Sequence, residues 1–104
     1  VKGGPSLNDA TLEDARAAGL DEVATVIDNG ADGPGTILAR CSSDFGRVFD
    51  AAPLILAKGQ ANYECLSDLG RGVFFVLESK CPVIAAALCE VGGVPVGSVV
   101  LAHL

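Results

Sequence analysis

A lysine and a glycine that follow a short apolar run are the residues in this chain best suited to binding an anion. Residues 54–57 are apolar, too few for a helix, and lead directly into Lys58, Gly59 and Gln60, with Asn62 just beyond. This pattern is typical of a buried strand that surfaces and turns into a helix. Lys58 adds a positive charge there, and Gly59 permits close approach of a ligand or a positive φ. With the free N–H groups of the following helix, these residues predict an anion site, for which phosphate is the commonest ligand.

Two interpretations of Lys58 remain open from spacing alone. The ammonium either clamps a phosphate, or it extends to solvent or pairs with a neighbouring acid. The neighbouring Gly59, Gln60 and Asn62 favour the anion.

A second candidate is Asn8-Asp9, in the polar turn before the first expected helix. A carboxylate at a strand end suits a hard cation such as Mg²⁺ or Mn²⁺, which prefers oxygen ligands. An Asn-Asp pair before a helix is equally common as a cap. The pair Asp28-Asn29 opens a glycine-rich loop over residues 28–36, which either surrounds a ligand or is an ordinary long connection. Asn-Gly is in the first place a turn signal.

Several catalytic classes are disfavoured. The only histidine, His103, stands next to the last residue, so a Ser-His-Asp or Cys-His arrangement would depend on a weakly anchored group. Neither a P-loop nor a G-x-G-x-x-G pattern is present. No C-x-x-C pair occurs among the four cysteines, which argues against structural zinc and for reduced thiols. They are Cys41, Cys65, Cys81 and Cys89.

Composition indicates one soluble domain over residues 1–104, with cytoplasmic location as the expectation. Half of the residues are hydrophobic, and 13 acids against 7 bases give a net charge of −6. Such a surface has no basic patch for nucleic acid or acidic lipid. The longest uncharged run, 91–104, has 14 residues interrupted by glycine and proline, whereas a membrane span needs roughly 18 or more. We therefore expect neither nucleic acid nor membrane as a partner.

The elements that must position these residues alternate along the chain. We expect the end of a strand at residues 1–4, helices over 11–18 and 62–69, and further helices beginning near 37–39, 43–45 and Pro82, the last ending at Gly92-Gly93. We expect strands at 23–27, up to 58, 73–77 and 97–102. The expected strands are continuous apolar runs that do not alternate with polar residues. The prediction is therefore an α/β fold with a mostly parallel sheet and helices on both faces, a Rossmann-like three-layer partial domain. Polar stretches at 3–9, 28–36, 58–62 and 78–80 then fall at strand ends, where such sheets bind ligands.

Several motifs in one order resemble a known family. They are Lys-Gly-Gly-Pro at 2–5, Asn-Asp-Ala-Thr at 8–11, Glu-Asp-Ala at 13–15, Gly-Pro-Gly-Thr at 33–36, Lys-Gly-Gln at 58–60, Asn-Tyr-Glu at 62–64 and Lys-Cys-Pro-Val at 80–83. In that order they resemble the C-terminal part of the metal-dependent damage-control phosphatases, domain of unknown function 89, and most closely its short archaeal and bacterial branch. The likeness covers nearly the whole chain, but about the last third of a family member.

The resemblance implies a phosphatase acting on phosphorylated, often damaged, small metabolites with a divalent metal, Mn²⁺, Ni²⁺, Co²⁺ or Mg²⁺. It implies that Asp9 helps hold the metal, with Asn8 beside it. It also implies that Lys58 contacts the substrate phosphate, with Gly59 and Asn62 next to it. Asp9 and Lys58 are thus the expected catalytic residues.

Two departures from the family pattern bear on this expectation. Ala61 stands where a second glycine is usual. The family's other metal ligands, an Asp-Asn pair upstream of the segment matching Gly3 to Asp9, fall before Val1, and Asp28-Asn29 is not that pair. The expectation is therefore a phosphatase or its C-terminal half-site. The alternatives are a non-catalytic α/β module that binds a phosphorylated ligand, and a structural fragment that needs a partner chain or forms homo-oligomers through an exposed sheet edge.

Overall fold

The computed structural model describes residues 1–88 and 93–104, which form two compact units, residues 1–52 and residues 53–104. The predicted helix end at Gly92 lies outside the described residues. No helix in the described part of the chain has the length and apolar character needed to cross a bilayer.

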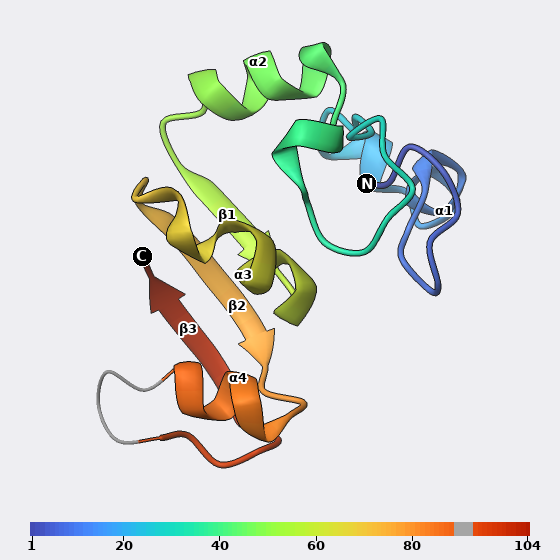
Figure 1. Ribbon diagram of the computed structural model, residues 1–104. Helices are drawn as coiled ribbons and strands as arrows, with labels where there is room; N and C mark the ends of the chain where they lie inside the picture. Colours follow the sequence, from blue (N-terminus) through green and yellow to red (C-terminus); the bar gives the residue numbers. More distant parts are fainter. Residues whose placement is uncertain (89–92) are drawn as a thin grey trace. The chain divides into compact units, whose positions relative to one another are not determined.

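The second unit contains a three-stranded sheet with helices (Figure 1). Its elements in order are β1 (Ile55–Lys58), α3 (Gln60–Leu66), the 3₁₀ helix η3 (Ser67–Leu69), β2 (Val73–Glu78), α4 (Pro82–Ala87) and β3 (Val99–His103). β2 is the middle strand, parallel to β1 and antiparallel to β3. The predicted strands up to 58, at 73–77 and at 97–102 are thereby confirmed, as is Pro82 in the first turn of a helix.

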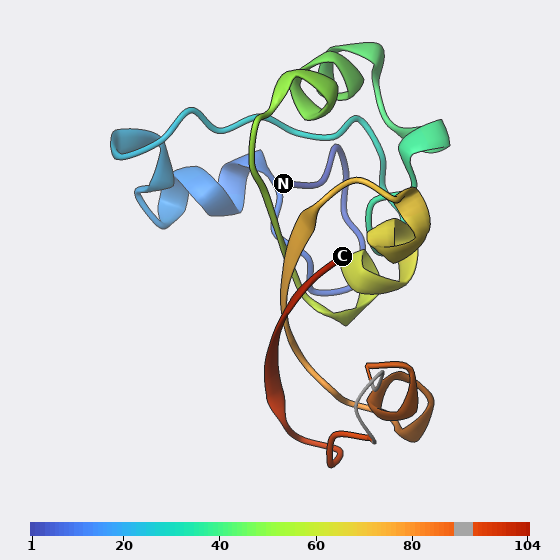
Figure 2. The same ribbon diagram turned by 90° about the vertical axis from the view of Figure 1, so that its left-hand side faces the viewer.

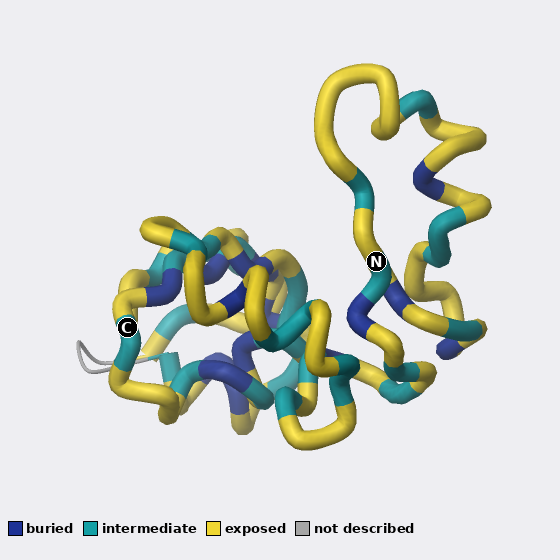
Figure 3. The backbone as a smooth tube through the Cα atoms, turned by 90° about the horizontal axis from the view of Figure 1, so that it is seen from above, coloured by how far each residue is buried: buried dark blue, intermediate teal, exposed yellow. Residues whose placement is uncertain are grey.

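The core of this unit lies between β2 and α3. Val73, Phe75 and Leu77 alternate inward along β2 and are fully or almost fully buried. The ring of Tyr63 meets Phe75 edge-on at 5.4 Å between centroids, a favourable arrangement for two aromatic rings. Leu66 is buried with Tyr63 on the same helix, so α3 turns this face toward the core. Figure 2 shows α3 and α4 on the same side of the strands, and Figure 3 shows the buried stretches of the chain in dark blue.

The α/β class is confirmed, but the sheet is mixed. The parallel expectation is wrong for β3, which alternates exposed and half-buried residues in the manner of a one-sided antiparallel strand. Ser79 shows why the chain reverses here. Its N–H donates to Ser98 O at 2.9 Å and its hydroxyl to Pro95 O at 2.9 Å, while Gly97 N–H donates to Ser79 O at 2.7 Å. These bonds bring the chain back alongside β2.

The first unit contains short helices joined by long loops, and much of its trace is exposed (Figure 3). The helices are α1 (Leu12–Ala17), the 3₁₀ helices η1 (Leu20–Glu22) and η2 (Leu38–Arg40), and α2 (Ser43–Ala51). The predicted helix over 11–18 is confirmed, with Thr11 and Ala18 as its caps. The helix expected near 37–39 is η2, and α2 begins one residue from its predicted cap because the hydroxyl of Ser42 accepts from Phe45 N–H.

The strand predicted over residues 23–27 is wrong, since these described residues form no strand. Val23 is 81% exposed, so its β-branched side chain has no core to pack against. The backbone that does pair lies slightly later. Val1 N–H donates to Ile27 O at 3.0 Å, Asn29 N–H to Val1 O at 2.9 Å and Gly3 N–H to Ala31 O at 2.8 Å. Propensity alone predicted a strand here because it cannot show which backbone finds a partner.

Asp14 caps α1 and gives this unit a pH-dependent contact. Thr11 N–H and the Thr11 hydroxyl both donate to Asp14 Oδ2 at 2.8 Å, which holds the pKa of this carboxyl below its ordinary value. Because folding lowers this pKa, the ionised carboxylate stabilises the folded state. The stabilisation is complete above the pKa of an unfolded aspartate, about 4, and is lost as the pH falls through the lowered pKa of the folded state.

We expect Asp14→Asn to be less stable than wild type at neutral pH, with the difference shrinking as pH falls below about 4. Urea unfolding of both proteins between neutral and acid pH measures this difference. A gap that stays constant with pH would contradict the assigned contact.

Candidate functional site

The turn from β1 into α3 presents Lys58 and Gly59 as the sequence predicts. Lys58 is the last residue of β1 and is exposed, and Gly59 is the N-cap of α3. Gly59 adopts φ 97° and ψ 152°, so the positive φ anticipated for this glycine is confirmed. Its N–H donates to Val76 O on β2 at 2.9 Å, which ties the turn to the middle strand.

Asn62 supports this turn from within α3. Its side-chain Nδ2 donates to the carbonyl oxygen of Lys58 at 2.7 Å, closing the strand-to-helix connection. The structure thus gives Asn62 a defined contact with the backbone of the predicted phosphate-binding lysine. A direct contact of Asn62 with phosphate stays a prediction.

A pocket of about 280 Å³ lies at the carboxyl ends of β1 and β2 in the second unit. Its lining includes Lys58, Gly59, Gln60, Glu78 and Lys80, with Val99 of β3. It therefore brings the lysine singled out from the sequence together with a second lysine that sequence analysis did not select. The available signal for Lys80 was its position in the polar stretch directly after a strand.

In the first unit, the predicted metal ligand Asp9 lies beside a buried lysine. Lys2 is only 8% exposed, its Nζ donates to the carbonyl of Gly35, and it stands 3.9 Å from Asp9 Oδ2. Asp9 is partly exposed and Asn8 is exposed. Sequence analysis did not select Lys2, because nothing in the spacing shows that this lysine is buried.

The donor set for a metal is incomplete within the described residues. Over residues 1–88 and 93–104, no three His, Cys, Asp or Glu side chains gather as a metal site. Asp9 supplies one carboxylate and Asn8 one amide, and the ammonium of Lys2 lies 3.9 Å from Asp9 Oδ2. The metal-binding roles of Asp9 and Asn8, and the meeting of Asp9 with Lys58 over one phosphoryl group, stay predictions.

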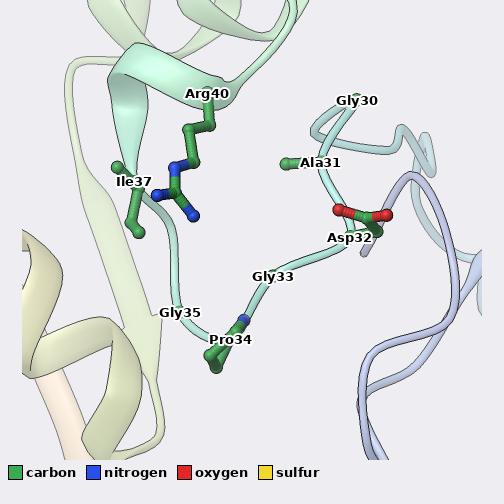
Figure 4. A pocket seen from close by; sticks show the side chains of 8 residues that line it. All are labelled: Gly30, Ala31, Asp32, Gly33, Pro34, Gly35, Ile37 and Arg40. Atoms are coloured by element: carbon green, nitrogen blue, oxygen red, sulfur yellow. The ribbon is translucent and has the colours of Figure 1, made fainter.

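The pair Asp28-Asn29 has the turn role that its sequence favours. Asn29 is buried and its Oδ1 accepts from Gly3 N–H at 3.2 Å and Ala31 N–H at 3.1 Å. Asp28 Oδ1 accepts from Gly30 N–H at 2.8 Å. The loop after them encloses a pocket of about 120 Å³, into which Arg40 extends from η2 with Asp32 on the facing side (Figure 4).

Histidine and cysteine chemistry find no support in the described residues. His103 stacks on Phe74 at 4.1 Å between ring centroids, at the end of β3. Cys41, Cys65 and Cys81 form no disulfide in the described part of the chain, and Cys89 lies outside the described residues.

Comparison with known proteins shows the family to which the chain belongs. Residues 1–94 match the family described as the damage-control phosphatase ARMT1-like domain, and this chain belongs to that family. It is 46% identical over 105 residues to the uncharacterized protein MJ0202 of Methanocaldococcus jannaschii, covering 97% of this chain and 33% of the relative. It is 43% identical over 88 residues to the damage-control phosphatase PH1575 of Pyrococcus horikoshii, covering 84% of this chain and 31% of the relative.

A solved structure agrees with this assignment. The crystal structure of a DUF89 family protein from Pyrococcus horikoshii matches 98% of this chain and 35% of its own, with a TM-score of 0.90 and 41% sequence identity. The chain spans about a third of the length of the relatives it matches.

Two glycines test whether backbone conformation at the turn is essential. A Cβ at Gly59 or at Gly46 of α2 would meet nothing within 4 Å, so crowding is absent at both. We expect Gly59→Ala to lower the free energy of unfolding by about 1–3 kcal/mol, since alanine is strained at this φ and ψ. We expect Gly46→Ala to raise it by about 0.5–1 kcal/mol, since alanine favours a helix. Urea denaturation measures both, and equal effects would contradict the role assigned to Gly59.

Lys2 and Asp9 should differ strongly as contributors to stability. Replacing Lys2 with Met leaves the buried carbonyl of Gly35 without its donor, which should cost about 1–3 kcal/mol. Asp9→Asn removes only a long, partly exposed ion pair and should cost under about 1 kcal/mol. Thermal and urea unfolding of the two variants provide the comparison. If Asp9→Asn lowered the free energy of unfolding as much as Lys2→Met does, the ion pair and not the carbonyl contact would be the main source of stability at Lys2.

Proposed function

We propose that this chain forms the C-terminal, phosphate-binding part of a metal-dependent phosphatase that hydrolyses phosphate monoesters of small metabolites in the cytoplasm. The observation that carries the proposal is the position of Lys58. It is an exposed lysine at the carboxyl end of a strand parallel to its neighbour, lining a pocket beside a glycine turn. Membership of the damage-control phosphatase family supplies the reaction class.

In this proposal the residues of the second unit bind and orient the substrate phosphate. The Lys58 ammonium donates to phosphate oxygens and offsets negative charge, which grows on the transferred group in the transition state. Gly59 keeps the backbone clear of side chains next to it, since nothing lies within 4 Å of where its Cβ would stand. Asn62 holds the carbonyl of Lys58 and thereby the direction of the strand end.

Asp9, with Asn8 beside it, would contribute oxygen ligands to a divalent cation, Mn²⁺, Ni²⁺, Co²⁺ or Mg²⁺. When bound, such a cation supplies charge stabilisation on the phosphoryl group and an activated water. One carboxylate does not complete such a site. We place the remaining ligands in the part of the relatives that this chain does not span.

The alternative is a module that binds a phosphorylated ligand without chemistry, favoured by the incomplete donor set in the described residues. It shares the Lys58 pocket and differs in needing no metal at Asp9. A third alternative, a fragment that associates through an open sheet edge, follows from β1 and β3 standing at the two edges of the sheet. Size-exclusion chromatography separates this last alternative from a monomer.

Hydrolysis of p-nitrophenyl phosphate with added Mn²⁺ or Ni²⁺ tests the enzyme. In a longer chain that also carries the remaining metal ligands, we expect metal-dependent turnover that falls about a hundredfold or more in Asp9→Ala and in Lys58→Gln. Arg47→Gln in α2 is the control for loss of one exposed positive charge and should not change the rate. Phosphate binding without turnover at any metal concentration in that longer chain would support the binding module and reject the enzyme.

A further inference from the structure

Gln60 connects the two lysine-bearing segments of the second-unit pocket. Its Oε1 accepts from the backbone N–H of Lys80 at 3.0 Å. Its Nε2 donates to Glu64 Oε1 at 2.9 Å, one turn later in α3, and contacts Cys81 Sγ at 3.7 Å. One side chain in the first turn of α3 thus anchors the segment that follows β2.

This contact restrains the backbone of Lys80, next to Ser79, which is itself bonded to residues 95–98. β1 and β2 are parallel, with Lys58 paired to Val76, so Lys80 stands four residues beyond that pair along the chain. A lysine beyond the end of a strand has no ladder to hold its backbone. The hydrogen bond that Lys80 N–H donates to Gln60 Oε1 adds a restraint, and Lys80 lines the same pocket as Lys58.

The charges lining the pocket show why a second lysine matters. Lys58, Lys80 and Glu78 all contribute to the lining. With Lys58 alone, the carboxylate of Glu78 would leave the lining with no net positive charge, whereas Lys80 makes it positive by one. In the described part of the chain, neither ammonium has an ion-pair partner within 4.0 Å, so both can bind an anion.

We propose that Lys80 is a second phosphate-binding cation in this pocket and that Gln60 is the residue that positions it. The proposal rests on the proposed binding of phosphate by Lys58 and adds the partner that the charge of the pocket requires. A phosphate dianion has several oxygens and accepts from two ammonium groups at once, which strengthens binding beyond one point charge.

Titration of the 104-residue chain with inorganic phosphate, followed by NMR chemical shifts, tests the role of Lys80. We expect the Kd to rise about tenfold in Lys80→Gln and by at least as much in Lys58→Gln. The control Arg47→Gln, which removes an exposed charge outside the pocket, should leave the Kd unchanged. Lys80→Gln should also reduce the dependence of binding on salt.

A double-mutant cycle tests whether Gln60 acts through Lys80. Gln60→Met keeps the length of the side chain and removes its hydrogen bonds with Lys80, Glu64 and Cys81, and should raise the Kd about threefold to fivefold. The double variant Gln60→Met with Lys80→Gln should bind no more weakly than Lys80→Gln alone. Gln60→Met should still weaken binding when Lys58 is Gln. If Gln60→Met caused a general loss of structure, it would weaken phosphate binding equally in wild type, in Lys80→Gln and in Lys58→Gln. The NMR spectrum would show such a loss directly.

The outcomes separate this inference from the proposed function. Phosphate binding that requires Lys58 and is indifferent to Lys80→Gln would overturn the role of Lys80 and leave the proposed function intact. A Gln60 effect of the same size with and without Lys80 would overturn the positioning role alone. A wild-type chain that binds no phosphate would reject the Lys58 site, and with it the second cation.

Discussion

The strand-to-helix turn after β1 is the constraint on which the second unit depends. Gly59 takes a backbone conformation that side chains resist, and its N–H bonds to the neighbouring strand. Asn62 then fixes the carbonyl of Lys58, and Gln60 reaches across to the segment after β2. Three consecutive contacts from one turn therefore place two lysines at the same end of the sheet, where a parallel pair of strands leaves room for a ligand.

A buried lysine has the corresponding role in the first unit. This unit has few regular elements, and its loops are held by backbone bonds and by Lys2, whose ammonium contacts the loop carbonyl of Gly35. Asp9 shares that ammonium at a longer distance and keeps part of its carboxylate exposed. A carboxylate so placed is restrained by a neighbouring cation while still open to solvent.

The mixed sheet follows from a local clamp. Ser79 is completely buried, and its amide, carbonyl and hydroxyl all bond to the stretch from Pro95 to Ser98. These bonds satisfy the buried polar groups of Ser79 and hold the returning chain next to the end of β2. The antiparallel β3 brings Val99 opposite Glu78 and so completes one wall of the lysine-lined pocket.

What the sequence by itself determined was local. Five features depend only on neighbours within a few residues. They are the apolar run ending in Lys58, the positive φ of Gly59, the Thr11–Asp14 cap, the turn at Asp28-Asn29 and the buried face of α3. Only the tertiary structure decided the direction of β3, the absence of a strand at residues 23–27, the burial of Lys2 and the bond from Gln60 to Lys80. Each of these joins residues far apart in the chain, and a pattern of residue types does not specify which distant backbone or carbonyl a group will meet.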